Sequence, residues 1–432
     1  MPHTTTLARR SPSHAHPRQS MRMAAIDVGS NSIHMIVAEA DVEGGITTLW
    51  RMKEMIGLGR SSFPSRVIPR EAIDHAIAVL ARFQQAAQQR QCEKIVATAT
   101  SAVREASNGG DFIERIDRNL HLDVRVISGR EEARLIYLGA RHATDLSGGP
   151  HLVVDIGGGS VEFIVGDHKT TALLESRKLG AARMTASFVK SDPISDEDHA
   201  ALLQHYDKEL TPLCEQILQH KPGKFIGTSG TLENIALLCN PEHADGNGTG
   251  HERPNVIERG AFDELFHKLL KSSSKQRAEM VGLDEGRREQ IVAGAALVNE
   301  LFKRLKLRRI VMCKSALREG ILVDYLSRHL PDLAIRQQVP DPRMRSVIAL
   351  ARRCTWHKSH SEQVARLTLR LFDDTRALHG FGTPERELIE YGALLHDIGW
   401  HIGRTGHHKH SAYLIRNGDL KNFTPLEIEI IA

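Results

Sequence analysis

The chain has 432 residues, of which 41% are hydrophobic and 25% charged, so its composition is that of an ordinary soluble protein and excludes a disordered chain. One domain takes roughly 100 to 200 residues, and no apolar run reaches the ~18 residues of a spanning helix, so we predict several domains and no integral membrane contact. Four arginines that precede Asp27 account for the net charge of +4, so the rest of the chain has no net charge. This excludes a strongly basic domain that binds nucleic acid through its phosphates. Five scattered cysteines without a C-x-x-C pair favour the reducing cytoplasm.

The first 22 residues are rich in Pro, Ser, Thr and His and contain no apolar stretch that would form the core of a signal peptide. We predict that residues 1–22 are a disordered basic leader. With this leader, Met21 or Met23 is a candidate alternative start. A transit peptide is the alternative interpretation.

Residues 23–140 have the pattern of an α/β domain. Two apolar runs flank a polar turn within residues 23–37, which predicts a β-hairpin. Apolar residues recur at helical spacing in residues 69–90. Beyond this helix we predict a strand at residues 94–98, a loop that contains Arg104, a helix from Asp111 and a strand at residues 124–127. Alternating strands and helices indicate an α/β layer.

Residues 141–328 repeat this design. Residues 151–165 again read as strand, glycine-rich turn and strand, and Asp155 lies about 128 residues after Asp27 at the matching position. The simplest explanation is an internal duplication. A strand followed by a helix is predicted at residues 225–234, an exposed loop at 241–254, a strand at 309–313 and a helix at 317–326.

Residues 343–432 lack strand alternation and follow two prolines, Pro340 and Pro342. We predict a separate all-α domain here. Its pattern is still amphipathic at Ile431 and Ala432, so we expect this domain to be incomplete in the chain as given.

The two turns carry the chemistry. Asp27 precedes a turn of small polar residues, and Asp155 precedes three consecutive glycines, a costly sequence that suits close approach of a ligand to the backbone. Backbone N–H groups of such turns bind phosphate, and Asp155 with Glu162 supplies hard oxygen ligands for Mg²⁺. An ordinary hairpin turn is the alternative for each motif taken alone.

Four motifs in order resemble the exopolyphosphatase and guanosine pentaphosphate phosphohydrolase (Ppx/GppA) family of the sugar kinase, actin and heat-shock chaperone superfamily. They are I-D-V-G-S-N-S at residues 26–32, S-G-R-E-E-A-R-L at 128–135, D-I-G-G-G-S-V-E at 155–162 and G-T-S-G-T at 227–231. The segment at residues 313–320 keeps the family's ending but opens with a cysteine and a lysine. The resemblance implies two duplicated ribonuclease-H-like (actin-like ATPase) domains that hold a phosphate chain between their hairpins.

The resemblance also assigns roles residue by residue. Glu132 matches the general base that orients and deprotonates the attacking water, although its residue type alone would suit the exposed first turn of a helix. Asp27, Asp155 and Glu162 match the Mg²⁺ ligands. The remaining matches are phosphate contacts, namely Gly29, Ser30, Asn31, Ser32, Arg104, Gly157, Gly158, Gly159, Ser160, Gly227, Thr228, Ser229 and Gly230.

The helical domain resembles the opening of an HD phosphohydrolase domain, in which two histidines and two aspartates bind a divalent metal. His360, His396 and Asp397 match three of these four ligands, and the fourth would lie beyond Ala432. In the longer exopolyphosphatases the resembling lobe has no working metal site and extends the polyphosphate-binding surface, which is the alternative interpretation.

The resemblance therefore predicts a Mg²⁺-dependent, processive exopolyphosphatase that acts on inorganic polyphosphate and pairs as a homodimer. Hydrolysis of guanosine pentaphosphate to the tetraphosphate is the close alternative, because both substrates end in a phosphoanhydride. A sugar-kinase-like phosphotransferase and an actin-like nucleotide switch are more distant alternatives. The helical domain favours long-chain polyphosphate.

Overall fold

The computed structural model describes residues 20–41, 46–240, 256–329, 341–354, 356–418, 420 and 423–432. The predicted leader up to residue 19 and the predicted loop at 241–254 lie outside the described residues. The chain divides into two units, Met1–Leu330 and Pro331–Ala432. Among the described residues, none of the helices is both long and apolar enough to cross a bilayer.

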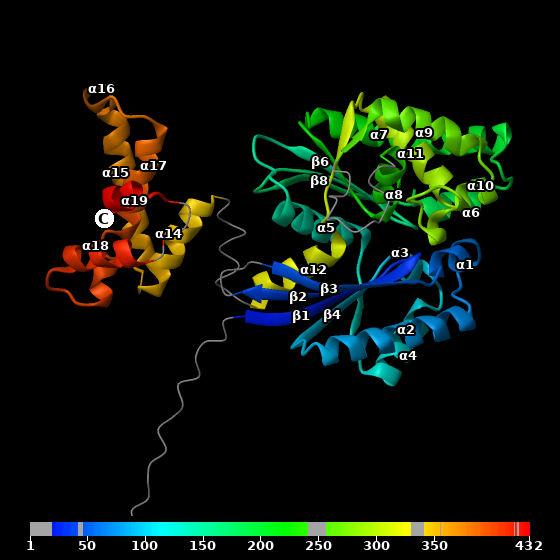
Figure 1. Cartoon of the computed structure of the whole chain (residues 1–432), viewed down its shortest axis with the longest axis horizontal. Coiled ribbons are helices and arrows are strands. Elements are labelled where there is room, and N and C mark those ends of the chain that lie inside the picture. The colour runs from blue at the N-terminus through cyan, green and yellow to red at the C-terminus, as the bar shows by residue number, and fades with distance from the viewer. Residues whose placement is uncertain are drawn as a thin grey trace, which may run out of the picture. The chain divides into compact units, whose positions relative to one another are not determined.

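The first sheet has five strands in the order β3-β2-β1-β4-β5. Strands β1 and β2 form the predicted antiparallel hairpin, and β4 and β5 continue the sheet in parallel. Helices α2 and α4 lie below the sheet in Figure 1. The elements in chain order are β1 (Ser20–Val28), β2 (Ser32–Asp41), β3 (Ile46–Met55), α1 (Leu58–Ser65), α2 (Arg70–Gln89), β4 (Lys94–Ala99), α3 (Ser101–Glu105), α4 (Gly109–Leu120) and β5 (Val124–Val126).

The second sheet repeats the order of the first, as β8-β7-β6-β9-β11-β10. The β6–β7 hairpin is antiparallel, and β9 pairs in parallel with both β6 and β11. Its elements are β6 (His151–Ile156), β7 (Val161–Gly166), β8 (Thr171–Arg177), α6 (Ala181–Phe188), α7 (Asp196–Gln219), β9 (Phe225–Thr228), α8 (Gly230–Cys239), β10 (Val256–Glu258), α9 (Arg259–Lys271), α10 (Ser274–Ala278), η2 (Glu285–Arg287), α11 (Ile291–Arg304) and β11 (Arg309–Met312). The duplicated α/β fold predicted from the sequence is confirmed.

Each sheet with the helices packed on it forms one lobe, and two helices pack on the sheet of the other lobe. Helix α5 (Gly129–Ala143) packs on β7 and β8 of the second sheet, and α12 (Leu317–His329) packs on β1 of the first sheet. The helices cross where neither tolerates a side chain: a Cβ on Gly139 would collide with the Ala316 carbonyl oxygen, and one on Gly320 with that of Leu135. The helices at the predicted boundaries, residues 140 and 328, thus each pack on the sheet of the other predicted domain.

In the second lobe, successive side chains of β6 point to opposite faces of the sheet, and both faces are buried. Leu152, Val154 and Ile156 of β6 are buried in one cluster with residues of α7, α8 and α11. Val153 lies between them and therefore points to the opposite face of the sheet, on the side where α5 packs. Both faces of β6 are thus buried, which explains its almost continuous apolar sequence.

The second unit contains only helices among its described residues, as predicted. Helix α17 packs against α14, α15 and α19, and the apolar faces of these helices form one core. The elements are α14 (Pro342–Arg353), α15 (Lys358–Asp374), α16 (Arg376–His379), α17 (Thr383–Leu395), η3 (Ile398–His401), α18 (His407–Asn417) and α19 (Pro425–Ile431).

Two local predictions were wrong. The leader does not extend to residue 22, because β1 begins at Ser20 and Met21 pairs with Ala40 in the sheet. Arg104 lies in the short helix α3, not in a loop. Five residues are too few to show a hydrophobic period, so this helix leaves no readable pattern in the sequence.

Candidate active site

A cavity of about 120 Å³ lies between the turns of the two hairpins. The first hairpin contributes Asp27, Gly29, Ser30, Asn31 and Ser32, and the second contributes Asp155, Gly157, Gly158, Gly159 and Ser160. Glu132 of α5 completes the wall between them, together with Ser229 and Gly230 at the start of α8. Residues from four distant segments of the sequence thus meet at one site.

The two turns have the same backbone geometry. The N–H of Gly29 donates to the carbonyl of Ser32 over 3.1 Å, and the N–H of Gly157 donates to the carbonyl of Ser160 over the same distance. Across the cavity the turns nearly touch. A Cβ on Gly159 would lie 2.9 Å from Ser30 Oγ and would collide with Ser101. The glycine therefore allows the close approach of the two lobes.

A chain of hydrogen bonds orients the hydroxyl of Ser32. The Arg318 guanidinium donates to His34 Nδ1 over 2.9 Å, so the other ring nitrogen, Nε2, carries the proton and donates to Ser32 Oγ over 2.6 Å. Burial, with nearby Arg318, lowers the pKa of His34 to about 2, so the ring is neutral. Because Ser32 Oγ already accepts a hydrogen bond, its own proton is available to an acceptor in the cavity.

Glu132 is placed by the N-terminus of α5. The Ser128 hydroxyl caps this helix by accepting from the N–H of Glu131 over 3.1 Å, which fixes the first turn. The Glu132 side chain is buried and accepts from Arg104 Nη1 over 3.2 Å, and the same nitrogen donates to the Ile127 carbonyl over 2.6 Å. Burial, and then repulsion by Glu162, raises the pKa of Glu132 well above its usual value. This carboxylate is a stronger base than an exposed one.

The other carboxylates near the cavity also have raised pKa values. Burial raises the pKa of Asp27 to about 7 and that of Glu162 to about 8, and repulsion by Asp155 adds to both shifts. Burial also raises the pKa of Asp155. Within the described part of the chain, Asp27 Oδ1 is buried without a hydrogen-bond partner. Clustered, desolvated carboxylates with an unsatisfied oxygen have the chemistry that is needed to hold a cation.

Comparison with known proteins identifies the family of this chain. The Ppx/GppA phosphatase family matches residues 35–329, and its domain III matches residues 343–432. The chain belongs to the Ppx/GppA phosphatase family. It is similar to an exopolyphosphatase from Cytophaga hutchinsonii, with 30% identity and a TM-score of 0.67 over 71% of this chain and 98% of that one. It is also similar to the Aquifex aeolicus family member, with 26% identity and a TM-score of 0.60 over 72% and 98% of the two chains.

Four of the predicted contacts of this Ppx/GppA phosphatase do not line the cavity. Arg104 lies on Glu132, as described above. Glu162 faces Asp155 across the hairpin and accepts from Ser176 Oγ over 2.7 Å. Thr228 donates its hydroxyl to Asp155 Oδ2 over 2.5 Å, and Gly227 packs on Leu232. These residues support the groups that line the cavity.

The cavity has two cationic residues that the sequence reasoning missed, Arg287 and Arg318. Arg287 is buried and donates to Thr231 Oγ1 over 3.1 Å. Arg318 lies in the segment at residues 313–320 that carries the family's ending, so this motif gave a signal for it. Arg287 lies in η2, outside every motif, and only the fold brings it to the cavity.

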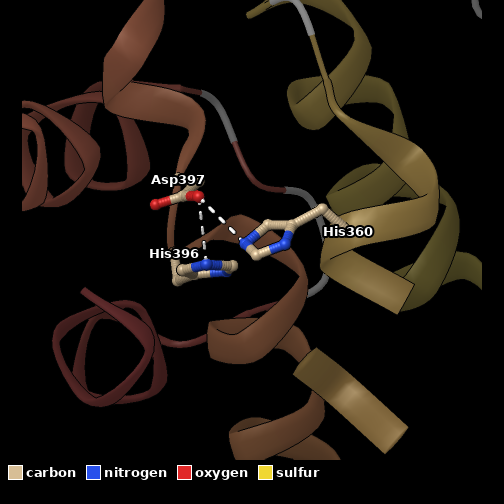
Figure 2. Close-up of side chains that lie close together, drawn as sticks. All are labelled: His360, His396 and Asp397. Atoms are coloured by element: carbon tan, nitrogen blue, oxygen red, sulfur yellow. Dashed lines mark ion pairs between the residues drawn. The ribbon is translucent and has the colours of Figure 1, made fainter. Parts of the chain in front are cut away.

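The helical unit brings together the other predicted metal ligands of this phosphatase. His360 comes from α15, and His396 and Asp397 follow α17 (Figure 2). One potential ligand atom from each of the three residues lies within 4.8 Å of the others.

Proposed function

We propose that this phosphatase is an exopolyphosphatase, which removes terminal orthophosphate from inorganic polyphosphate by processive, Mg²⁺-dependent hydrolysis. The observation that carries the proposal is the position of Glu132. This buried carboxylate with a raised pKa lines the same small cavity as the two glycine-rich turns. A base opposite a phosphate cradle is the arrangement that the attack of water on a terminal phosphoryl group needs.

The cradle for the terminal phosphoryl group consists of the two turns and two arginines. Ser32 offers its oriented proton, and Ser30 and Ser160 add hydroxyls from opposite sides. Arg287 also lines the cavity; its Nη1 donates to Thr231 Oγ1 and its Nε lies 3.9 Å from Asp284 Oδ2, so the guanidinium is held in place and adds positive charge beside the phosphoryl group. Charged donors in a site without bulk water contribute far more than they would on the surface.

The residues at the cavity also fit Mg²⁺. Asp27 and Asp155 line the wall, and the buried, unpaired Oδ1 of Asp27 supplies a hard oxygen with no protein partner within the described ranges. Asp27 and Asp155 would hold the ion directly, and Glu162 would act through its position beside Asp155. When bound, Mg²⁺ neutralises phosphate oxygens and increases the electrophilicity of the terminal phosphorus.

Two residues of the chain have separate roles in the hydrolysis, Glu132 as the base and Arg104 as the group that positions it. Glu132 holds a water molecule in line with the terminal phosphorus and takes its proton as the new P–O bond forms and the bond to the bridging oxygen breaks. Arg104 positions the Glu132 carboxylate and favours its charged form. The shortened polyphosphate leaves with the electron pair of the broken bond. Positioning and charge stabilisation provide most of the acceleration in such a reaction.

The size of the cavity favours a hydrolase over a nucleotide-binding kinase or switch. Typical sites for small-molecule ligands have about 300–1,000 Å³, whereas this cavity has about 120 Å³. The space beside Gly230 is filled by Arg287, since a Cβ on Gly230 would lie 2.6 Å from Arg287 Cζ. The cavity therefore suits a phosphoryl group better than a whole nucleoside triphosphate.

Guanosine pentaphosphate is the close alternative substrate, because it presents the same terminal group to the cavity. The resemblance to the Cytophaga exopolyphosphatase supports polyphosphate. The test is orthophosphate release from long-chain polyphosphate and from guanosine pentaphosphate, side by side with Mg²⁺. A higher kcat/KM for polyphosphate supports the proposal, a higher value for the nucleotide assigns the chain to the nucleotide-hydrolysing alternative, and release from neither contradicts both.

A further inference from the structure

A second pocket, of about 150 Å³, lies between α1 and α3 of the first lobe and residues 178–183 of the second lobe, which include the start of α6. Its charged lining residues are Arg66, Glu105, Lys178 and Arg183, so three positive charges face one negative charge. None of these four residues lines the cavity between the hairpins, and the sequence analysis assigned none of them to a site. The pocket therefore has an excess of positive charge that the proposed hydrolysis does not use.

Arg183 is fixed in the wall of this pocket. Its Nε donates to the Gly159 carbonyl over 2.8 Å, and its Nη2 donates to Glu105 Oε1 over 2.7 Å. The centroid of the Phe63 ring lies 3.9 Å from Arg183 Cζ, which is a cation–π contact. The Arg183 side chain is 14% exposed. Its two hydrogen bonds leave further N–H groups of the guanidinium for another acceptor.

The positive charge on Arg183 is only partly compensated. Burial lowers the pKa of its guanidinium, Glu105 opposes this shift, and nearby Arg104 and Arg66 add to it. Glu105 is also shared, because its Oε2 lies 2.8 Å from Lys178 Nζ. One carboxylate that pairs with two cations does not neutralise both of them, so the remaining charge would stabilise an anion in the pocket.

Arg66 is positioned by its backbone. Its N–H donates to the Ser62 carbonyl over 2.7 Å at the end of α1, and its own carbonyl accepts from the N–H of Ser107 over 2.8 Å. The guanidinium of Arg66 forms no ion pair with a carboxylate within the described ranges. Because this side chain is exposed, the pocket is accessible to ions from solvent.

The size and charge of the pocket favour a small oxyanion. An engineered cavity of about 150 Å³ binds benzene, so the same volume accommodates a tetrahedral ion such as orthophosphate. A phosphate group carries up to about two negative charges, which match the excess of positive charge in the lining. Arginine and lysine are also the side chains that bind phosphate oxygens most strongly.

Close packing at Gly159 separates this pocket from the cavity between the hairpins. A Cβ on Gly159 would collide with Phe63, which lines the pocket, and with Ser101, which lines the cavity. The two spaces thus lie on opposite sides of the same glycine-rich turn. This separation favours a free ion over a segment of a phosphate chain held in the cavity.

We infer that this pocket is a binding site for free orthophosphate, with Arg66, Lys178 and Arg183 as its contacts. Arg183 binds the ion from the wall, and the two exposed cations bind it from the rim. Glu105 competes with the ion for the same cations and therefore limits its affinity. The inference does not rest on the function proposed for the cavity, because binding here requires no hydrolysis.

The test is the acetylation of individual lysines in the full chain, measured by mass spectrometry while inorganic phosphate is increased at constant ionic strength without Mg²⁺. We expect phosphate to protect Lys178 with a saturable dependence on concentration, and the midpoint gives the dissociation constant of the pocket. Lys169 is the internal control. It is exposed and lines neither the pocket nor the cavity, so its acetylation rate should not change.

Two variants should shift this midpoint in opposite directions. Arg66→Met should weaken phosphate binding by at least about 10-fold, because it removes a hydrogen bond between charged groups. Glu105→Gln should tighten binding by up to about fivefold, since it removes the competing charge at nearly the same volume. Arg70→Met is the matched control for Arg66→Met, because Arg70 is exposed outside the pocket, and it should leave the midpoint unchanged.

The opposite signs separate a lost contact from a lost fold, since misfolding would weaken binding in both variants. An equal midpoint in the wild type and in Arg66→Met would overturn the assignment, as would weaker binding in Glu105→Gln. Absence of any protection of Lys178 in the wild-type chain would also overturn it. Protection by long-chain polyphosphate but not by orthophosphate would overturn the assignment to a free ion.

Discussion

Replacing Glu132 by glutamine should slow turnover strongly while leaving the fold and substrate binding intact. The substitution keeps the volume of the side chain and an acceptor for Arg104, 3.2 Å away, but removes the base. General bases contribute about 10²- to 10⁴-fold to the rate, so kcat should fall by that factor, which is about 3 to 5.5 kcal/mol in activation free energy. KM should stay constant or fall, because the variant removes a negative charge from an anion site.

The stability of the same variant provides an independent check. Because burial raises the pKa of Glu132, its ionised form is disfavoured in the folded state, so Glu132→Gln should melt at the wild-type temperature or above it at about pH 8. The neighbouring Glu131 is the matched control: it is partly exposed and pairs with Arg134 over 2.7 Å. Glu131→Gln should cost less than about 1 kcal/mol of stability and leave kcat within about twofold.

The assay is steady-state orthophosphate release from long-chain polyphosphate, with melting followed by circular dichroism. Near wild-type kcat in a folded Glu132→Gln chain would refute the role of Glu132 as the base. An equal loss of kcat in Glu131→Gln would refute the reasoning from position, because that side chain does not line the cavity.

Three further predictions follow from the cavity. Without Mg²⁺, the stability that protonated Asp27 and Glu162 contribute should be lost as the pH rises through about 7 and 8. Mg²⁺ should therefore raise the melting temperature more at about pH 8.5 than at about pH 6. The variant Asp27→Asn should reduce this difference between the two pH values. Arg287→Met should raise KM for polyphosphate by about 10-fold or more, since a hydrogen bond to a charged group contributes about 1.5–3 kcal/mol, whereas Arg288→Met, outside the cavity, should not change KM. Gly159→Ala should cost about 1–3 kcal/mol of stability through overpacking, measured by urea unfolding, and an unchanged midpoint would contradict the close approach of the two lobes at this residue.

The sequence was sufficient where the signal is local. The paired hairpins were predictable because strand alternation, an aspartate and a glycine-rich turn occur together at Asp27 and again at Asp155. The duplication follows from that repeat, and it led to the correct fold class. The resemblance added Glu132, which residue type alone would have placed on an exposed helical turn.

The rest depended on contacts between distant segments. The exchange of α5 and α12 between the lobes is decided by which sheet each helix covers, and helical spacing does not encode that choice. For the same reason Arg287 was missed, since it reaches the cavity through packing of a neighbouring element. Arg104 was matched to a phosphate contact, which stays a prediction, and the structure places its guanidinium on the Glu132 carboxylate.

The most direct test of hydrolysis in this cavity is the isotopic content of the product. With the wild-type chain in excess over polyphosphate and with Mg²⁺ in H₂¹⁸O, the first orthophosphate released from each polyphosphate chain should contain one solvent-derived oxygen, because water attacks the terminal phosphorus held between the two turns. A first orthophosphate without ¹⁸O would mean that the neighbouring phosphorus is the point of attack, and it would contradict the role assigned to Glu132 and the cradle.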